Sequence, residues 1–372
     1  MPATGATFQT LSETDIIIST VVNFVGNAST TTPELYNGDN ADGVLSGDGS
    51  CSDGEWVWEP VVWSLRAIIQ CIFSLLGIVG NFLVMAVLIQ RRKAAKLTDA
   101  LVGGLAAADF LTSVFMVPVP IPREVPDTFL GHAACKILES SVLLWMCVGA
   151  SVATLTLIAV ERYIAVVHPF RLKSWMNHRR AKGWIVAVWV FSAVRASHIT
   201  VTSVVNQSTC RCELQLLQLW LQGILGMVEC LALLIVPVTI MVVTHLLVAR
   251  ALRKDSARLS DLLSKSSTPA QNLMRVRQKI SWLFLTILLA YVVCMCPDIF
   301  GFLLLTFGLF DTSFLQSALY QAFVLLAFCN SCINPIIYSI RLPSFRRALV
   351  ELFTGKAPDK SKPSIFGPEN RM

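Results

Sequence analysis

Residues 61–89 read VVWSLRAIIQCIFSLLGIVGNFLVMAVLI, an apolar run whose single charge is Arg66. About 20 helical residues cross the ~30 Å hydrocarbon core of a bilayer, so this run is long enough to span a membrane. A lone strand would leave backbone groups unsatisfied in lipid, which makes a helix the favoured structure. Six similar runs follow, and we expect spans at Val61–Ile89, Thr98–Pro122, Leu138–Val166, Gly183–Val205, Leu217–Val248, Ile280–Phe307 and Phe314–Ile340. The sequence therefore predicts an all-α membrane protein, a seven-transmembrane helix bundle.

The composition agrees with a membrane protein. The chain is 54% hydrophobic and 15% charged, whereas about a quarter of the residues of a soluble domain are charged. Of the 30 Lys and Arg residues, 25 fall at the inner end of the third span or in the segments that share its side. Since basic segments stay cytoplasmic, we expect a multi-pass plasma membrane protein with an extracellular N-terminus.

Three regions follow from this topology. We expect residues 1–60 to be a disordered acidic extracellular tail, because they carry nine acids, no Lys or Arg and little to bury. No basic start followed by an apolar run indicates a cleavable signal, so the first span would direct insertion. Residues 61–340 form the transmembrane domain, and residues 341–372 an interfacial helix and cytoplasmic tail.

The interfacial helix is predicted at Pro343–Phe353. Phe345, Leu349, Leu352 and Phe353 fall on one face of it, with basic residues beside them. This pattern is typical of a short amphipathic helix in the membrane interface. A frayed basic tail is the alternative.

Two sequons and four cysteines lie on the predicted outer side. The sequons begin at Asn27 and Asn206, and they predict glycosylation sites. The cysteines are Cys51, Cys135, Cys210 and Cys212, and they occur where disulfides persist. Four cysteines allow three pairings, and the residues alone leave all of them open.

Polar side chains inside the spans are costly and indicate a role. Asp109 lies in the second span, and hydroxyl and amide groups from the third and seventh spans could surround it. Such oxygens suit a hard cation, and the alternative is a protonated Asp109 in a polar helix contact. The expected set is Asp109, Ser151, Asn330, Ser331 and Asn334.

Short motifs recur along residues 61–353 in a fixed order. They are Gly80-Asn81, Leu105 to Asp109, Glu161-Arg162-Tyr163, Trp189, Pro237, Cys294-x-x-Pro297 and Asn334-Pro335-Ile336-Ile337-Tyr338. Each is weak alone, but each stands on the expected helix. Together they resemble the rhodopsin-like (class A) G-protein-coupled receptors, most closely the peptide-receptor group.

The resemblance implies roles for these residues. Arg162, held by Glu161 at rest, would meet a heterotrimeric G protein when the sixth helix swings outward. Phe170 would dock against that partner, and the polar set around Asp109 would hold an allosteric sodium ion. No other cofactor or metal is expected. The predicted coupling and switch residues are Glu161, Arg162, Tyr163, Phe170, Pro237, Met295, Pro297, Asn334, Pro335 and Tyr338.

The chain also departs from the family pattern. Met295 stands where a tryptophan is usual, Tyr291 where a phenylalanine is usual, and His245 where a tyrosine is usual. Arg277 stands where some relatives carry an acid that pairs with Arg162, so we expect that lock to be missing. Cys135 lies two residues further from Arg162 than usual, and the resemblance implies that it pairs with Cys210 or Cys212, with Cys51 taking the other.

Residues in the outer half of the bundle bear on the kind of ligand. Leu144 replaces the aspartate that amine receptors carry, which disfavours a simple amine. Glu229 and Asp298 should face the central cavity by family geometry, where a cationic ligand group would pair with them. An internal pair between Glu229 and Arg195 is the alternative. The predicted ligand-binding residues are Glu229, Asp298, Trp145, Leu144, Phe302 and Tyr320.

We therefore predict a receptor that binds an extracellular ligand, a peptide and in particular a basic one, and activates a G protein. Its partners would be that G protein, the ligand and membrane lipids, with no nucleic acid. No nucleophile with a paired base suggests an enzyme. A receptor for a lipid or small molecule, a constitutively active receptor, and a transporter or channel are the alternatives.

Overall fold

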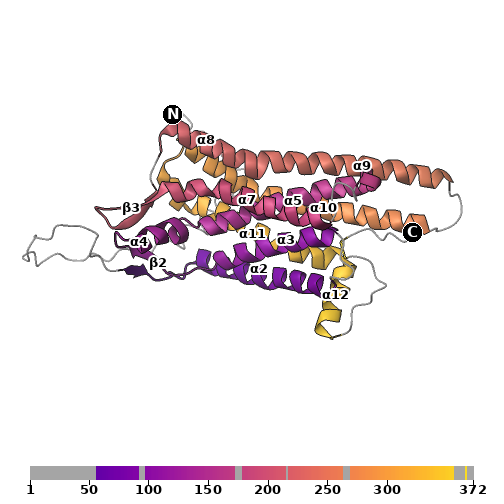
Figure 1. Cartoon of the computed structure of the whole chain (residues 1–372), viewed down its shortest axis with the longest axis horizontal. Helices are drawn as coiled ribbons and strands as arrows, with labels where there is room; N and C mark the ends of the chain where they lie inside the picture. Colours follow the sequence, from indigo (N-terminus) through magenta and orange to yellow (C-terminus); the bar gives the residue numbers. More distant parts are fainter. Residues whose placement is uncertain are drawn as a thin grey trace, which may run out of the picture.

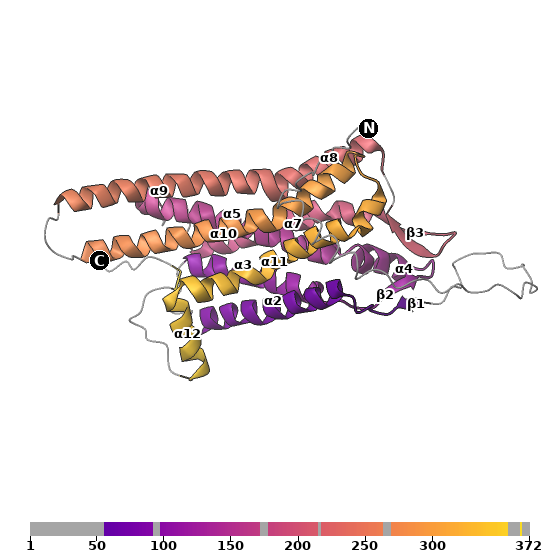
Figure 2. The same ribbon diagram turned by 180° about the vertical axis from the view of Figure 1, so that it is seen from behind.

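The computed structural model of the chain describes residues 56–91, 97–171, 178–214, 217–262, 269–355 and 365–366. Within these ranges, seven helical segments are long and apolar enough to cross a membrane. Figures 1 and 2 show them running side by side along the long axis of the molecule, with β2 and β3 at one end and α12 lying across the other. We call these the β end and the α12 end.

The seven spans are built either from single helices or from consecutive helices joined end to end. Five are single: α2 (Leu65–Gln90), α3 (Leu97–Phe115), α7 (His178–Thr202), α10 (Pro269–Thr306) and α11 (Ala318–Arg341). The third span joins α4 (Phe129–Ala134), the π-helix η3 (Cys135–Glu139) and α5 (Val142–Val167). The fifth joins α8 (Leu219–Cys230), the π-helix η4 (Leu231–Ile235) and α9 (Val236–Leu262).

Short elements close the two ends of the bundle. At the β end, β1 (Val57–Glu59) pairs antiparallel with β2 (Ile121–Glu124), and β3 (Ser203–Asn206) with β4 (Arg211–Leu214). The 3₁₀ helix η5 (Thr312–Gln316) leads into α11. At the other end, α12 covers Pro343–Phe353, the bounds predicted from the sequence.

Several of the expected span boundaries differ from the ends of the helices. The second span ends at Phe115 rather than Pro122, because Pro118, Pro120 and Pro122 cannot continue a helix. The third begins at Phe129, where the Thr128 side chain accepts a hydrogen bond from the Gly131 amide and caps the helix. The fourth gives way to β3 at Ser203.

The segment Arg250–Lys279, between the expected fifth and sixth spans, is also helical over much of its length. Helix α9 continues to Leu262 and α10 begins at Pro269. Residues 250–262 are mostly Ala, Leu, Arg, Lys, Ser and Asp, and they contain no Pro or Gly that would end a helix.

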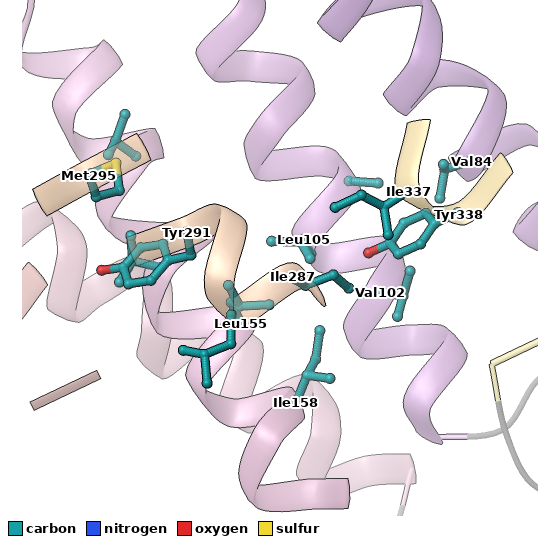
Figure 3. Packing of buried hydrophobic residues seen from close by; sticks show 14 of the residues in the cluster. Val84, Val102, Leu105, Leu155, Ile158, Ile287, Tyr291, Met295, Ile337 and Tyr338 are labelled. Atoms are coloured by element: carbon teal, nitrogen blue, oxygen red, sulfur yellow. The ribbon is translucent and has the colours of Figure 1, made fainter. Parts of the chain in front are cut away.

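The core lies where α3, α5, α10 and α11 meet. Figure 3 shows Leu155 and Ile158 of α5 packed with Tyr291 and Ile287 of α10 in this region. In an apolar stretch of 18 residues, 56% of the third span is buried but only 17% of the fourth. The third span is thus central and the fourth peripheral, with apolar side chains facing outward where lipid would be.

Small residues bring neighbouring helices into close contact. A Cβ atom on Gly80 of α2 would lie 2.9 Å from the Pro335 Cβ of α11, and one on Gly77 would overlap the Ser113 side chain of α3. These approaches place α2 directly against α3 and α11. They help to position the polar residues described next.

Candidate functional site

Asp109 is the centre of a buried polar cluster between three helices. Its Oδ1 accepts a hydrogen bond from the Ser151 hydroxyl at 2.6 Å, and its Oδ2 accepts one from the Asn334 amide at 2.9 Å. Asp109 is fully buried, and Asn330 and Ser331 are buried beside it on α11. The structure therefore brings the predicted polar residues of α3, α5 and α11 into one region of the bundle.

Backbone carbonyls extend this network to α2. The Asn81 amide donates to the carbonyls of Gly77 and Ser331, both at 2.9 Å. The Ser113 hydroxyl donates to the Asp109 carbonyl at 2.7 Å, and the Ser74 hydroxyl donates to the Ser113 carbonyl at 2.6 Å. The cluster thus connects α2, α3, α5 and α11 by hydrogen bonds.

Arg162 lies near the α12 end of α5, in a second polar cluster. Its Nε donates to Glu161 Oε2 at 2.6 Å and its Nη2 to Glu161 Oε1 at 2.8 Å. Nη2 also donates to the Thr98 hydroxyl, which itself donates to Glu161 Oε1 at 3.0 Å. Glu161 is 1% exposed and Arg162 8%, so this is a buried ion pair whose groups are hydrogen-bonded on several sides.

Other residues contact Arg162 that the sequence did not indicate. Thr98, at the start of α3, bridges both members of the pair. The Phe284 ring of α10 lies 5.9 Å from the guanidinium carbon, within cation–π range. The carbonyl of Phe366, near the C-terminus, accepts a hydrogen bond from Arg162 Nη1 at 3.2 Å. Because Phe366 is 204 residues away, no local pattern could have shown this contact.

The remaining predicted coupling residues are spread along the bundle, down to the α12 end. Phe170 is 95% exposed at that end, and the Tyr163 hydroxyl lies 3.3 Å from His168 Nε2. Met295 is fully buried in the core, as Figure 3 shows. Pro297 and Pro335 lie inside α10 and α11, and Pro237 is the second residue of α9, which follows η4. Tyr338 packs its ring edge-on against Phe345 and Phe366.

A cavity of about 640 Å³ opens toward the β end. Five of the six predicted ligand-binding residues line it: Trp145, Glu229, Asp298, Phe302 and Tyr320. Leu144 does not. It is 5% exposed and belongs to the apolar core, because the neighbouring Trp145 takes the direction toward the cavity.

Charged side chains line this cavity unevenly. Its acids are Glu139, Glu213, Glu229, Asp298 and Asp311, against one arginine, Arg195, and one histidine, His198. Acidic groups therefore dominate the wall of the cavity.

Glu229 is paired with Arg195. Arg195 Nη1 donates to Glu229 Oε2 at 2.5 Å, and Nη2 donates to the Trp145 carbonyl at 2.6 Å. His198 Nδ1 lies 3.6 Å from Glu229 Oε1. Gly149 makes room for the guanidinium, since a Cβ there would lie 2.9 Å from Arg195 Nε and Nη2. The internal pair that the sequence left as an alternative is thus present.

Asp298 has no comparable partner. It is 4% exposed, and its Oδ1 has no hydrogen-bond partner among the described residues. Tyr320 lies close enough to interact with it electrostatically. Unlike Glu229, Asp298 is therefore a cavity-lining residue with a buried carboxylate oxygen, Oδ1, that no described group satisfies.

A disulfide joins Cys135 to Cys212, with Cα atoms 5.4 Å apart, and so ties η3 to β4. Cys210 is also disulfide-bonded. Cys51 lies outside the described residues, as does the sequon residue Asn27. The other sequon residue, Asn206, ends β3, and its amide donates to Glu213 Oε2 at 2.8 Å.

Comparison with known protein families identifies the family to which this seven-helix architecture belongs. Residues 80–338 match the 7 transmembrane receptor (rhodopsin family) model. The chain therefore belongs to the rhodopsin family of seven-transmembrane receptors, and it is a receptor rather than an enzyme.

Its similarity to individual receptors is moderate. It is 27% identical over 300 residues to the [Phe13]-bombesin receptor of Bombina orientalis, covering 77% of this chain and 75% of that one. It is 26% identical over 329 residues to the somatostatin receptor type 5 of Bos taurus, covering 87% and 82%. A shorter match, 35% identical over 131 residues, covers 35% of this chain and 20% of the octopamine receptor 1 of Lymnaea stagnalis.

Proposed function

We propose that this receptor binds a basic peptide in the cavity at the β end and activates a heterotrimeric G protein through the α12 end. The β end would face the extracellular side and the α12 end the cytoplasm. The basic residues that gather toward the α12 end support this orientation. The outward apolar side chains of helices such as α7 would contact membrane lipids.

The acidic lining of the cavity carries the proposal for the ligand. Five acids face one arginine, and that arginine is already paired with Glu229. A buried carboxylate without a partner is costly, and a cationic ligand group would satisfy it. The cavity volume of about 640 Å³ falls in the range of ~300–1,000 Å³ typical of ligand sites.

A peptide agrees with two further observations. The similar bombesin and somatostatin receptors are named for peptides. The N-terminal 60 residues carry nine acids and no Lys or Arg, which would attract a basic ligand before it docks.

Asp298 is the residue we assign to the ligand's cationic group. Glu229 has a hydrogen-bonded arginine, whereas Asp298 has an unsatisfied oxygen beside Tyr320 in the same cavity. A guanidinium or ammonium reaching Asp298 would complete its hydrogen bonds. Phe302 and Trp145 would make apolar contacts with the aliphatic part of the ligand side chain that carries the cation.

At the α12 end, Arg162 would be the group that changes partners on activation. In the present structure Glu161 and Thr98 hold it inward. The prolines of α10 and α11 each remove a helical hydrogen bond and allow these helices to bend. An outward movement of α10 would expose Arg162 to the G protein, with Phe170 as a second contact.

We also propose that the Asp109 cluster holds a sodium ion. The carboxylate of Asp109, the hydroxyls of Ser151 and Ser331 and the amide oxygens of Asn330 and Asn334 are the kinds of ligand that a hard cation takes. When bound, the ion would neutralise the buried carboxylate and stabilise the packing in which α3, α5 and α11 meet.

The test compares receptors exposed to fractionated basic peptides in cells that report G-protein activation. We expect one fraction to activate the wild type, and Asp298→Asn to raise the effective concentration by about 10- to 100-fold. Asp127→Asn is the matched control, because Asp127 carries the same charge at the β end but does not line the cavity. An equal response in all three receptors would exclude Asp298 as the ligand's partner.

A further inference from the structure

The residues that cover Arg162 include a short stretch near the C-terminus, Ile365–Phe366. Phe366 is 1% exposed and Ile365 4%, although both lie beyond α12 and outside the seven spans. Their side chains belong to the same apolar core as Tyr338 and Phe345. The chain thus returns to the α12 end of the bundle and buries two large apolar residues there.

The backbone of this stretch also forms hydrogen bonds with the helical bundle. The Phe366 amide donates to Asp99 Oδ1 at 3.4 Å, and its carbonyl accepts from Arg162 Nη1 at 3.2 Å. The Ile365 carbonyl accepts from the Ser344 hydroxyl at 3.2 Å. Side chains from α3, α5 and α12 therefore form hydrogen bonds with the backbone polar groups of the stretch, so the contact is specific as well as apolar.

The Phe366 ring fits an aromatic pocket. Its centroid lies 5.0 Å from that of Tyr338, with the rings at 71°, and 6.4 Å from that of Phe345. Edge-to-face pairs at such distances are favourable. The ring therefore connects the end of α11 with α12, next to the guanidinium of Arg162.

This contact involves the group that the proposed function assigns to G-protein coupling. Phe366 occupies one guanidinium nitrogen of Arg162, while Glu161 and Thr98 occupy the others. A partner that takes over this donor of Arg162 must displace the carbonyl of Phe366 from it. The sixth span carries Arg277 at the position where an acid would hold Arg162. Phe366 instead contacts Arg162 from a different part of the chain.

We propose that the Ile365–Phe366 stretch is an internal ligand of the coupling face, which holds Arg162 in its resting position and competes with the G protein. This inference rests on the proposed function for its signalling consequence, but not for the docking itself. A release of the stretch raises the fraction of receptor that couples without ligand.

The first experiment measures ligand-independent nucleotide exchange on a panel of purified G proteins with full-length receptor in lipid nanodiscs. Phe366→Ala should raise the basal rate by about threefold or more, as expected when a contact favouring one of two states is lost. Deletion of residues 356–372, which leaves α12 intact, should do the same. Asn370→Ala keeps Ile365 and Phe366 and is the control, and Arg162→Ala combined with Phe366→Ala should return the rate to background.

A second experiment tests the docking without signalling. A benzophenone amino acid at position 366 of the full-length receptor should crosslink to the segments that carry Tyr338 and Phe345, whereas one at position 370 should not. Absence of the crosslinks from position 366 would overturn the proposal.

The two readouts separate the possible failures. If wild-type exchange depends on Arg162 but Phe366→Ala leaves the basal rate unchanged, the inhibitory role is wrong while the proposed function stands. If no variant shows Arg162-dependent exchange, the proposed function fails and the inhibitory role with it, and the crosslinks report only where the stretch lies.

Discussion

The Tyr291 hydroxyl donates a hydrogen bond to the backbone carbonyl of Leu233. Leu233 lies four residues before Pro237, and Pro237 has no amide hydrogen, so this carbonyl cannot receive the usual helical hydrogen bond. Tyr291 of α10 thus donates to a carbonyl of the π-helix η4 that Pro237 deprives of its usual helical donor. The tyrosine, which looked in the sequence like an unusual replacement, has a specific partner.

This relationship predicts a loss of stability in Tyr291→Phe. The variant keeps the ring but leaves the buried Leu233 carbonyl without its partner, which should cost about 1–3 kcal/mol. Thermal unfolding of the purified receptor in detergent measures the change. Thr286→Val also removes one hydroxyl from α10, but that hydroxyl bonds only within its own helix, and it should have a smaller effect. Equal midpoints for wild type and Tyr291→Phe would contradict the account.

The Arg195–Glu229 pair predicts a strong coupling between two substitutions. Both side chains are nearly buried, at 3% and 9% exposure. Arg195→Met should destabilise the receptor by about 3–5 kcal/mol, because it leaves the Glu229 carboxylate buried and unpaired. The double variant Arg195→Met with Glu229→Leu should recover most of that loss, since it removes both charges. Thermal unfolding of the four proteins of this cycle measures the coupling, and additive effects would show that the pair is not energetically important.

The proposed sodium ion predicts a dependence of stability on the cation. Sodium at several times its dissociation constant should stabilise the wild type by about 1 kcal/mol. The comparison is made against N-methylglucamine chloride at the same ionic strength, which controls for screening. Asp109→Asn removes the only carboxylate of the cluster and should abolish the difference. A sodium effect that survives in Asp109→Asn would place the ion elsewhere.

Much of the fold could be predicted from local sequence. The seven spans follow from the length of their apolar runs, and the bounds of α12 follow from its apolar face and Pro343. The ends of the spans were harder, because the prolines after Phe115 and the Thr128 cap act at the level of single residues. The helical extension of α9 to Leu262 escaped prediction because its Ser and Arg residues resemble those of a solvated linker.

The candidate sites could be predicted where their residues lie in helices whose arrangement in the bundle follows from the family resemblance. Asp109, Ser151 and Asn334 met as expected, because spans two, three and seven are neighbours in the bundle. The choice between Cys210 and Cys212 for Cys135 was not predictable, since it depends on the geometry of β4. Leu144 does not line the cavity although Trp145 does, because a shift of one position on a helix turns a side chain by about 100°.

Contacts between distant segments were not predictable at all. Thr98 bonds Glu161 from another helix, and Phe366 reaches Arg162 from the far end of the chain. Neither residue carries a charge or a motif that would mark it. Their roles depend on three-dimensional proximity, which a single sequence does not show.

The most direct test of the central claim is ligand-stimulated G-protein activation by wild type and by Arg162→Ala at matched surface expression. The account predicts that a basic peptide fraction activates at least one G-protein family through the wild type. Arg162→Ala should bind the same fraction but remain silent, because the coupling face has lost its central cation. A response of Arg162→Ala equal to that of the wild type would contradict the claim that the receptor signals through this residue.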